Sequence, residues 1–72
     1  MIMKEQDIKR NLNKQVKFTD PSLHIDSAEY ILTAAIFRRG EKGFFYQAEL
    51  TDRTCRNSVI ICKLDQIEAI ND

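Results

Sequence analysis

The side chains that could carry chemistry are few: the thiols of Cys55 and Cys62 and the imidazole of His24, the one histidine among 72 residues. The two cysteines stand seven positions apart and form no CxxC pair, so these three side chains do not supply the ligand set of a zinc site. Catalysis needs a nucleophile, base or metal held in a pocket, and a small β-domain fills its interior with its own side chains. The sequence therefore predicts no enzyme, no metal site and no cofactor.

A second group of side chains could bind a polyanion. Basic and aromatic residues gather around one expected hairpin, at Arg38, Arg39, Lys42, Phe44 and Phe45. Small β-domains bind single-stranded RNA or DNA by stacking bases on exposed rings beside Lys or Arg. We keep nucleic-acid binding as the alternative function, with further cations at Lys9, Arg10, Lys14 and Lys17. The competing interpretation is a solvated charged turn beside core aromatics.

A third group could bind protein. The expected central strand, residues 30–37, is apolar on both faces, with Tyr30, Leu32, Ala34 and Ile36 on one and Ile31, Thr33, Ala35 and Phe37 on the other. A half-buried strand should instead alternate apolar and polar residues. Three interpretations stay open: the strand bends so that its halves serve different sheets, an N-terminal helix covers its outer face, or a second subunit covers it.

The outer apolar stripe of this strand and its neighbours is the main candidate interface, formed by Ile31, Phe37, Phe45, Val59 and Ile61. A domain of 72 residues has little core to spare, and a symmetric pair would bury the same stripe on both copies. We therefore expect a small interaction module that forms a homodimer or binds a protein partner. Nucleic acid ranks below protein as the ligand.

The N-terminal third should hold one helix and one strand. Ile8 and Leu12 recur at near-helical spacing within residues 4–12, and Val16 and Phe18 alternate with polar residues over 15–18. Pro21 and its polar neighbours then predict a loop over 19–27. In this loop we expect apolar side chains to turn to the core and polar ones to solvent, with Leu23 and Ile25 inward and His24 and Asp26 outward.

Three strands joined by short turns follow, at residues 30–37, 44–50 and 58–64. Gly40 and Gly43 should supply positive φ in the first turn. Tyr46 and Leu50 should belong to the core, Cys62 should be a small buried hydrophobe and Cys55 should be exposed in the second turn. A last strand at 67–70 should pair with the first and close a barrel.

Composition agrees with one globular domain spanning residues 1–72, with a helix in 1–13 and a barrel in 15–70. Eleven basic and eleven acidic residues give a formal charge of zero, which argues against a protein held on nucleic acid by bulk electrostatics. No run approaches the roughly 20 apolar residues that span a bilayer, and no signal-like apolar stretch opens the chain. We therefore expect no membrane association and a cytoplasmic location.

This order of elements resembles SH3-like and Sm-like barrels. Residues 8–18 are similar to the opening helix and first strand of Sm-like proteins, and residues 58–70 to their closing strand, turn and strand. The resemblance implies a mainly β, five-stranded small barrel with a short N-terminal helix. Sm proteins hold a uridine base with an Asp and Asn pair and an Arg-Gly. Here those places hold residues 38–43 and Cys62-Lys63, so the base pocket does not carry over.

Overall fold

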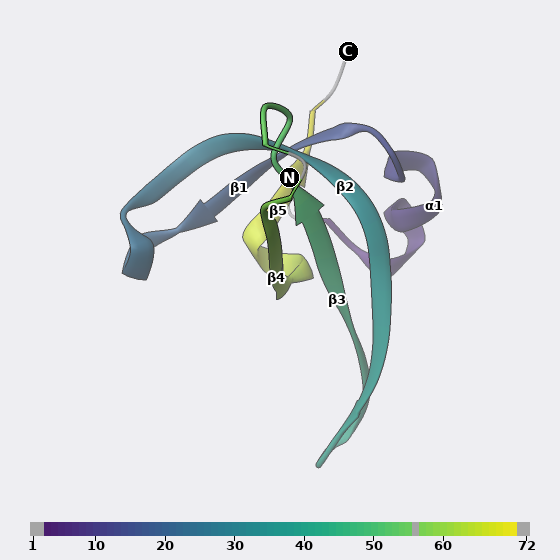
Figure 1. The fold of residues 1–72 in the computed structure, drawn as a ribbon. Helices are drawn as coiled ribbons and strands as arrows, with labels where there is room; N and C mark the ends of the chain where they lie inside the picture. Colours follow the sequence, from purple (N-terminus) through teal and green to yellow (C-terminus); the bar gives the residue numbers. More distant parts are fainter. Residues whose placement is uncertain (1–2, 56, 71–72) are drawn as a thin grey trace.

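The chain folds into one antiparallel sheet of five strands with a short N-terminal helix (Figure 1). The computed structural model describes residues 3–55 and 57–70. The strands are β1 (Gln15–Asp20), β2 (Ile25–Gly40), β3 (Gly43–Thr51), β4 (Val59–Lys63) and β5 (Ile67–Ala69), in the spatial order β4-β3-β2-β1-β5. The expected mainly β class is confirmed. The last strand pairs with the first as expected, but β4 and β5 remain the two edges of an unclosed sheet.

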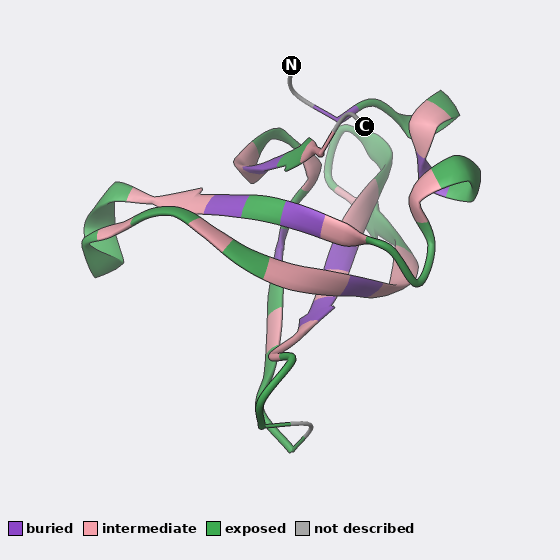
Figure 2. Cartoon of the chain, turned by 90° about the horizontal axis from the view of Figure 1, so that it is seen from above, coloured by how far each residue is buried: buried purple, intermediate pink, exposed green. Residues whose placement is uncertain are grey.

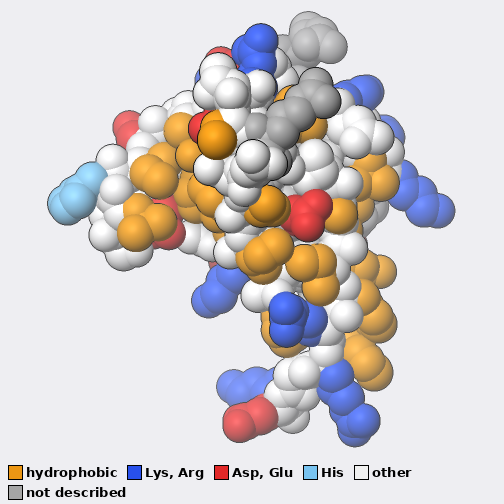
Figure 3. Space-filling model, viewed as in Figure 1, with side chains coloured by type: hydrophobic (Ala, Val, Ile, Leu, Met, Phe, Trp, Pro, Cys, Tyr) orange, Lys and Arg blue, Asp and Glu red, His pale blue; other side chains and the backbone are white. Residues whose placement is uncertain are grey.

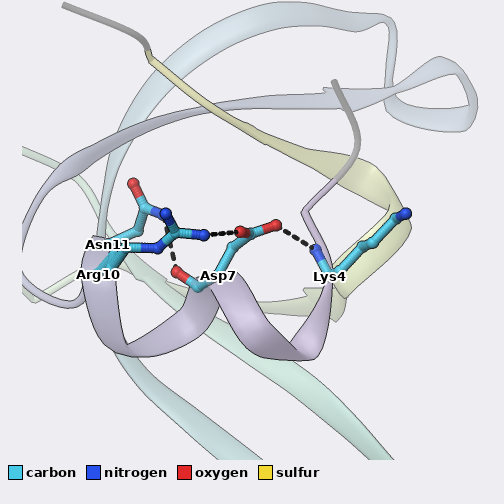
Figure 4. Close-up of polar contacts among 4 residues, drawn as sticks. All are labelled: Lys4, Asp7, Arg10 and Asn11. Carbon is cyan, nitrogen blue, oxygen red and sulfur yellow. Dashed lines mark hydrogen bonds and ion pairs between the residues drawn. The ribbon is translucent and has the colours of Figure 1, made fainter.

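The N-terminal helix is short and irregular. A 3-10 turn, η1 (Glu5–Asp7), runs into a single α-turn, α1 (Ile8–Asn11), within the range expected for one helix. Asp7 holds the two turns together, since its carboxylate accepts from the Lys4 amide at 3.2 Å and from Arg10 at 2.6 Å (Figure 4). Its carbonyl accepts from the Asn11 amide at 2.7 Å. Ile8 is buried, whereas Leu12 stays partly exposed.

The connection between β1 and β2 is tighter than expected. Asp20 caps a 3-10 turn, η2 (Pro21–Leu23), by accepting from the Ser22 amide at 3.1 Å, and β2 already begins at Ile25. His24 turns the chain in the left-handed region, with φ of 58°. Ile25 packs against the core as expected, and His24 and Asp26 are exposed. Leu23 was also expected to pack against the core, but it is exposed. The reason is that η2 lies beyond the paired part of the hairpin.

A β-bulge at Thr33 organises the long strand β2. Leu32 pairs with Leu50 and Ala34 with the next residue, Glu49, so Thr33 is one residue in excess. Its hydroxyl donates to the Glu49 carboxylate at 2.8 Å. The extra residue reverses the alternation of side chains beyond it and bends the strand. β2 is thus bent, as one of the three interpretations expected, although its halves pair with β1 and β3 in one sheet (Figure 1).

The bulge overturns the expected faces of the second half of β2. Ala35 and Phe37 pair with Ala48 and Tyr46 and lie on the core side of the sheet. Ala34 and Ile36 lie on the outer face, the side turned away from the core. Simple alternation from Leu32 placed both pairs on the wrong side because it counted Thr33 as an ordinary strand residue.

Most buried residues lie along the strands, and the ends of the hairpins are exposed (Figure 2). The buried members of the core are Met3, Val16, Phe18, Leu32, Ala48, Leu50, Cys62 and Ile67. The rings of Phe18 and Tyr30 meet edge to face with centroids 5.8 Å apart. Burial of Leu50 and Cys62 is confirmed. Tyr46 is only half-buried and lies outside the cluster, because it stands where β2 and β3 leave the core.

Candidate functional site

The hairpin of β2 and β3 continues beyond the sheet as an arm, residues 37–46 (Figure 1). In the described part of the chain these residues pair only with each other, because β4 begins to pair with β3 at Gln47. Gly43 has the expected positive φ, 125°. Gly40 does not; instead it makes room, since a Cβ there would lie 3.0 Å from the Phe45 ring.

One side of the arm, here called the aromatic face, carries Phe37, Arg39, Phe44 and Tyr46. The rings of Phe37 and Phe44 stack with their centroids 4.9 Å apart and their planes at 12°. The centroids of the Phe37 and Tyr46 rings also lie 4.9 Å apart. Phe37 and Phe44 keep 56% and 65% of their surface exposed. The rings therefore form an exposed row that continues the core side of the sheet past the core.

The predicted nucleic-acid residues are divided between the two sides of this arm. Arg39 and Phe44 share the aromatic face, Arg38 and Phe45 share the other face, and Lys42 lies in the turn. The space-filling view shows hydrophobic side chains along one side of the arm and positive ones around its tip (Figure 3). The five predicted residues thus lie on one hairpin as expected, but on different faces of it, and the prediction did not include Phe37 and Tyr46.

The cations of the arm differ from those near the N-terminus. Arg38, Arg39 and Lys42 are exposed, and none of them forms an ion pair within residues 3–55 and 57–70. Arg10 on α1 is held by Asp7 at 2.6 Å. Lys9 lies in α1, Lys17 lies in β1 and Lys14 lies between these two elements, which are away from the arm (Figure 1). The arm is thus a separate positive feature.

The predicted apolar stripe is also divided. Ile31, Phe45, Val59 and Ile61 share the outer face, but Phe37 lies on the opposite side because of the bulge at Thr33. Polar side chains of β3 interrupt this face, since Thr51 separates Ile31 from Val59 and Glu49 lies beside Ile61. The stripe is therefore not one continuous patch.

Val59 and Ile61 stand together on β4, with 53% and 46% of their surface exposed. β4 is an edge strand, and its only strand partner in the described chain is β3. An edge strand offers a row of unpaired backbone N–H and C=O groups to any strand that can approach. We call this strand edge, with its two exposed apolar side chains, the β4 edge.

A hollow of about 570 Å³ lies at the other end of the sheet, lined by Thr19, Pro21, Asp26, Ser27, Asp65, Gln66 and Glu68. Three of the seven lining residues are acidic, Asp26, Asp65 and Glu68. Across residues 3–55 and 57–70, no three His, Cys, Asp or Glu side chains lie close enough to hold a metal ion. The two cysteines are free, with Cys55 exposed and Cys62 buried.

Burial raises the pKa of the Cys62 thiol to about 11, and the carboxylates of Asp20 and Asp65 add to the rise. The folded state thus resists ionisation of this thiol, whereas the unfolded chain ionises it from about 9 upward. We expect the free energy of unfolding to fall between pH 9 and 11, by on the order of 1–3 kcal/mol for this group.

The measurement is urea unfolding of the parent and Cys62→Ala at pH 8 and 11, which lie on either side of the ordinary thiol pKa of 9.0. The difference between the two proteins removes the contribution of every other group. A parent and a variant that lose equal stability would show that Cys62 does not couple to folding.

Comparison of the chain with protein-family models, with curated proteins and with solved structures finds no match. None of the helices in the described part of the chain has the length and apolar character needed to cross a bilayer.

Proposed function

We propose that this protein is a non-enzymatic interaction module that self-associates through the β4 edge. The observation that carries the proposal is the exposure of Val59 and Ile61, 53% and 46%, on an edge strand. Burying apolar surface contributes roughly 25 cal/mol per Å². A second β4 would lie beside both side chains and pair with the outward backbone groups of the strand, except for the Lys63 N–H, which already donates to the Gln66 side-chain oxygen at 3.0 Å.

Antiparallel pairing of β4 with its own copy makes a symmetric contact. β4 has five residues, Val59–Lys63, and Ile61 is the central one. A two-fold axis through the middle of the strand would place Ile61 beside its own copy and Val59 beside Lys63 of the other chain. A homodimer of this kind needs no further gene product, and a heterologous protein strand is the alternative occupant.

We also propose that the sheet belongs to the SH3-like and Sm-like type of small barrel. The strand order β4-β3-β2-β1-β5, the bent β2 and the 3-10 turn η3 (Leu64–Gln66) between β4 and β5 support this. The free, exposed Cys55 suits a reducing compartment, which supports a cytoplasmic location.

The first test is the mass in solution. At about 100 µM, an association with a Kd of a few micromolar is largely complete, so light scattering should give about twice the 8.4 kDa of one chain. Ile61→Lys should return the mass to that of one chain. In the monomer the new lysine lies opposite Glu49, an acceptable pair, whereas in the dimer two lysines meet.

The matched control is Phe37→Lys, which adds the same charge at an exposed apolar residue on the opposite side of the sheet. It should leave the mass unchanged. A parent protein with the mass of one chain at this concentration would end the homodimer proposal. A dimer that survives Ile61→Lys but not Phe37→Lys would move the interface to the aromatic face.

A further inference from the structure

We propose that the aromatic face of the arm is a stacking platform for single-stranded nucleic acid, a binding function separate from self-association through the β4 edge. The platform consists of Phe37, Phe44 and Tyr46, with Arg39 at its outer end. It differs from the hairpin site expected from the sequence, because Phe45 and Arg38 point to the other side.

The first support is the exposure of the rings. Phe37 is the one ring that contacts Phe44 among the described residues, and it covers a single face of it. With 65% of Phe44 exposed, the opposite face of the ring lies open to solvent at the end of the row. Bases stack on such rings regardless of sequence, because every base has a flat π-face.

The second support is the charge around the rings. Residues 37–46 hold Arg38, Arg39 and Lys42 against one acid, Glu41, so three minus one leaves a net charge of +2. The three cations are exposed and make no ion pair in the described chain. Arg39 pairs across the hairpin with Phe44, which brings a phosphate-binding group next to the open ring.

These two features together favour a polyanion with flat bases over an apolar polypeptide. A polypeptide that covered Phe37 and Phe44 would bring Arg39 to the rim of an apolar contact without a partner for its charge. A nucleic-acid strand provides partners for the rings and for the cations, since its bases cover the rings and its phosphates face the cations. The formal charge of the whole chain is zero, so this attraction is local to the arm.

The test uses fluorescein-labelled oligothymidine of about twelve nucleotides, within the usual site size, and anisotropy at about 50 mM salt. An RNA oligomer of equal length and a DNA duplex are the comparison probes. The parent should bind either single strand more tightly than the duplex. Phe44→Ala should weaken binding about tenfold or more. Phe45→Ala, which removes a ring from the other side of the same arm, should change it less than about twofold.

A second variant separates binding from a purely structural role of the ring pair. The sequence contains no tryptophan, so Phe44→Trp places the sole indole of the protein at the platform. Stacking of a base should quench its fluorescence, and affinity should be kept or improved. Arg39→Ala should reduce the slope of log K against log salt by about 0.7, the value for one phosphate on a single strand.

No change in anisotropy at about 100 µM parent protein and low salt would exclude a useful affinity. Equal losses in Phe44→Ala and Phe45→Ala, or duplex bound as tightly as single strand, would show that charge alone acts. If Phe44→Ala melts early by circular dichroism, the Phe44→Trp quenching decides, and its absence rejects the platform.

Discussion

Leu50→Ala is expected to lower the free energy of unfolding by about 2–5 kcal/mol. Leu50 is completely buried, pairs with Leu32 on one side and with Ile60 on the other, and lies at the centre of the core. Truncation leaves a cavity that a sheet, fixed by its backbone pairing, can fill only in part. A domain this small has roughly 5 kcal/mol of stability, so the variant should be near unfolding at room temperature.

The matched control is Leu23→Ala, the same truncation at a leucine that is 59% exposed in η2. It should change stability by no more than about 0.5 kcal/mol. Thermal unfolding followed by circular dichroism measures both, and each kcal/mol should move the midpoint by about 4–8 °C. A Leu50→Ala protein that melts within a few degrees of the parent, or a Leu23→Ala protein that melts far below it, would contradict the core described here.

The faces of β1 and of the second half of β3 could be predicted because their sequences alternate. Val16 and Phe18 are separated by Lys17, and Leu50 and Ala48 by Glu49, so a polar residue marks the solvent side in each strand. The structure buries Val16, Phe18, Ala48 and Leu50 as this pattern requires. Where apolar and polar residues alternate along a strand, this alternation alone was sufficient to predict the buried face.

The second half of β2 could not be predicted, because its sequence does not mark a face. Residues 34–37 are all apolar, so neither parity is favoured locally. The choice is made by the partner strand, since Leu32 pairs with Leu50 while Ala34 takes the adjacent Glu49. A bulge of this kind is set by tertiary pairing and by the Thr33 hydroxyl on Glu49, neither of which the β2 sequence shows.

This single residue also redistributed the candidate sites. Counting without the bulge put Phe37 with Val59 and Ile61 on one apolar stripe. With the bulge, Phe37 joins Phe44 and Tyr46 on the aromatic face, while Val59 and Ile61 remain on the β4 edge. One predicted site therefore became two surfaces on opposite sides of the sheet, each with its own proposed ligand.

Because of the bulge, the same substitution at the neighbouring residues Ala34 and Ala35 is expected to have different effects on stability. Ala35→Lys should lower the free energy of unfolding by on the order of 2–3 kcal/mol, because Ala35 faces the core side opposite the fully buried Ala48. Ala34→Lys should be nearly neutral, since Ala34 lies on the outer face opposite Glu49, where opposite charges contribute roughly 0.2–1 kcal/mol.

Each variant is the control for the other, because both make the same substitution at adjacent alanines that are both half-buried. An unbulged strand predicts the reverse order, with Ala34 beside Leu32 on the core side and Ala35 outside. Urea unfolding of the two variants decides between them. If Ala34→Lys is the less stable protein, the bulge at Thr33 is absent, and Phe37 returns to the outer face with Val59 and Ile61. Phe37 would then no longer lie beside Phe44 and Tyr46, so this measurement tests the fold and the proposed stacking platform together.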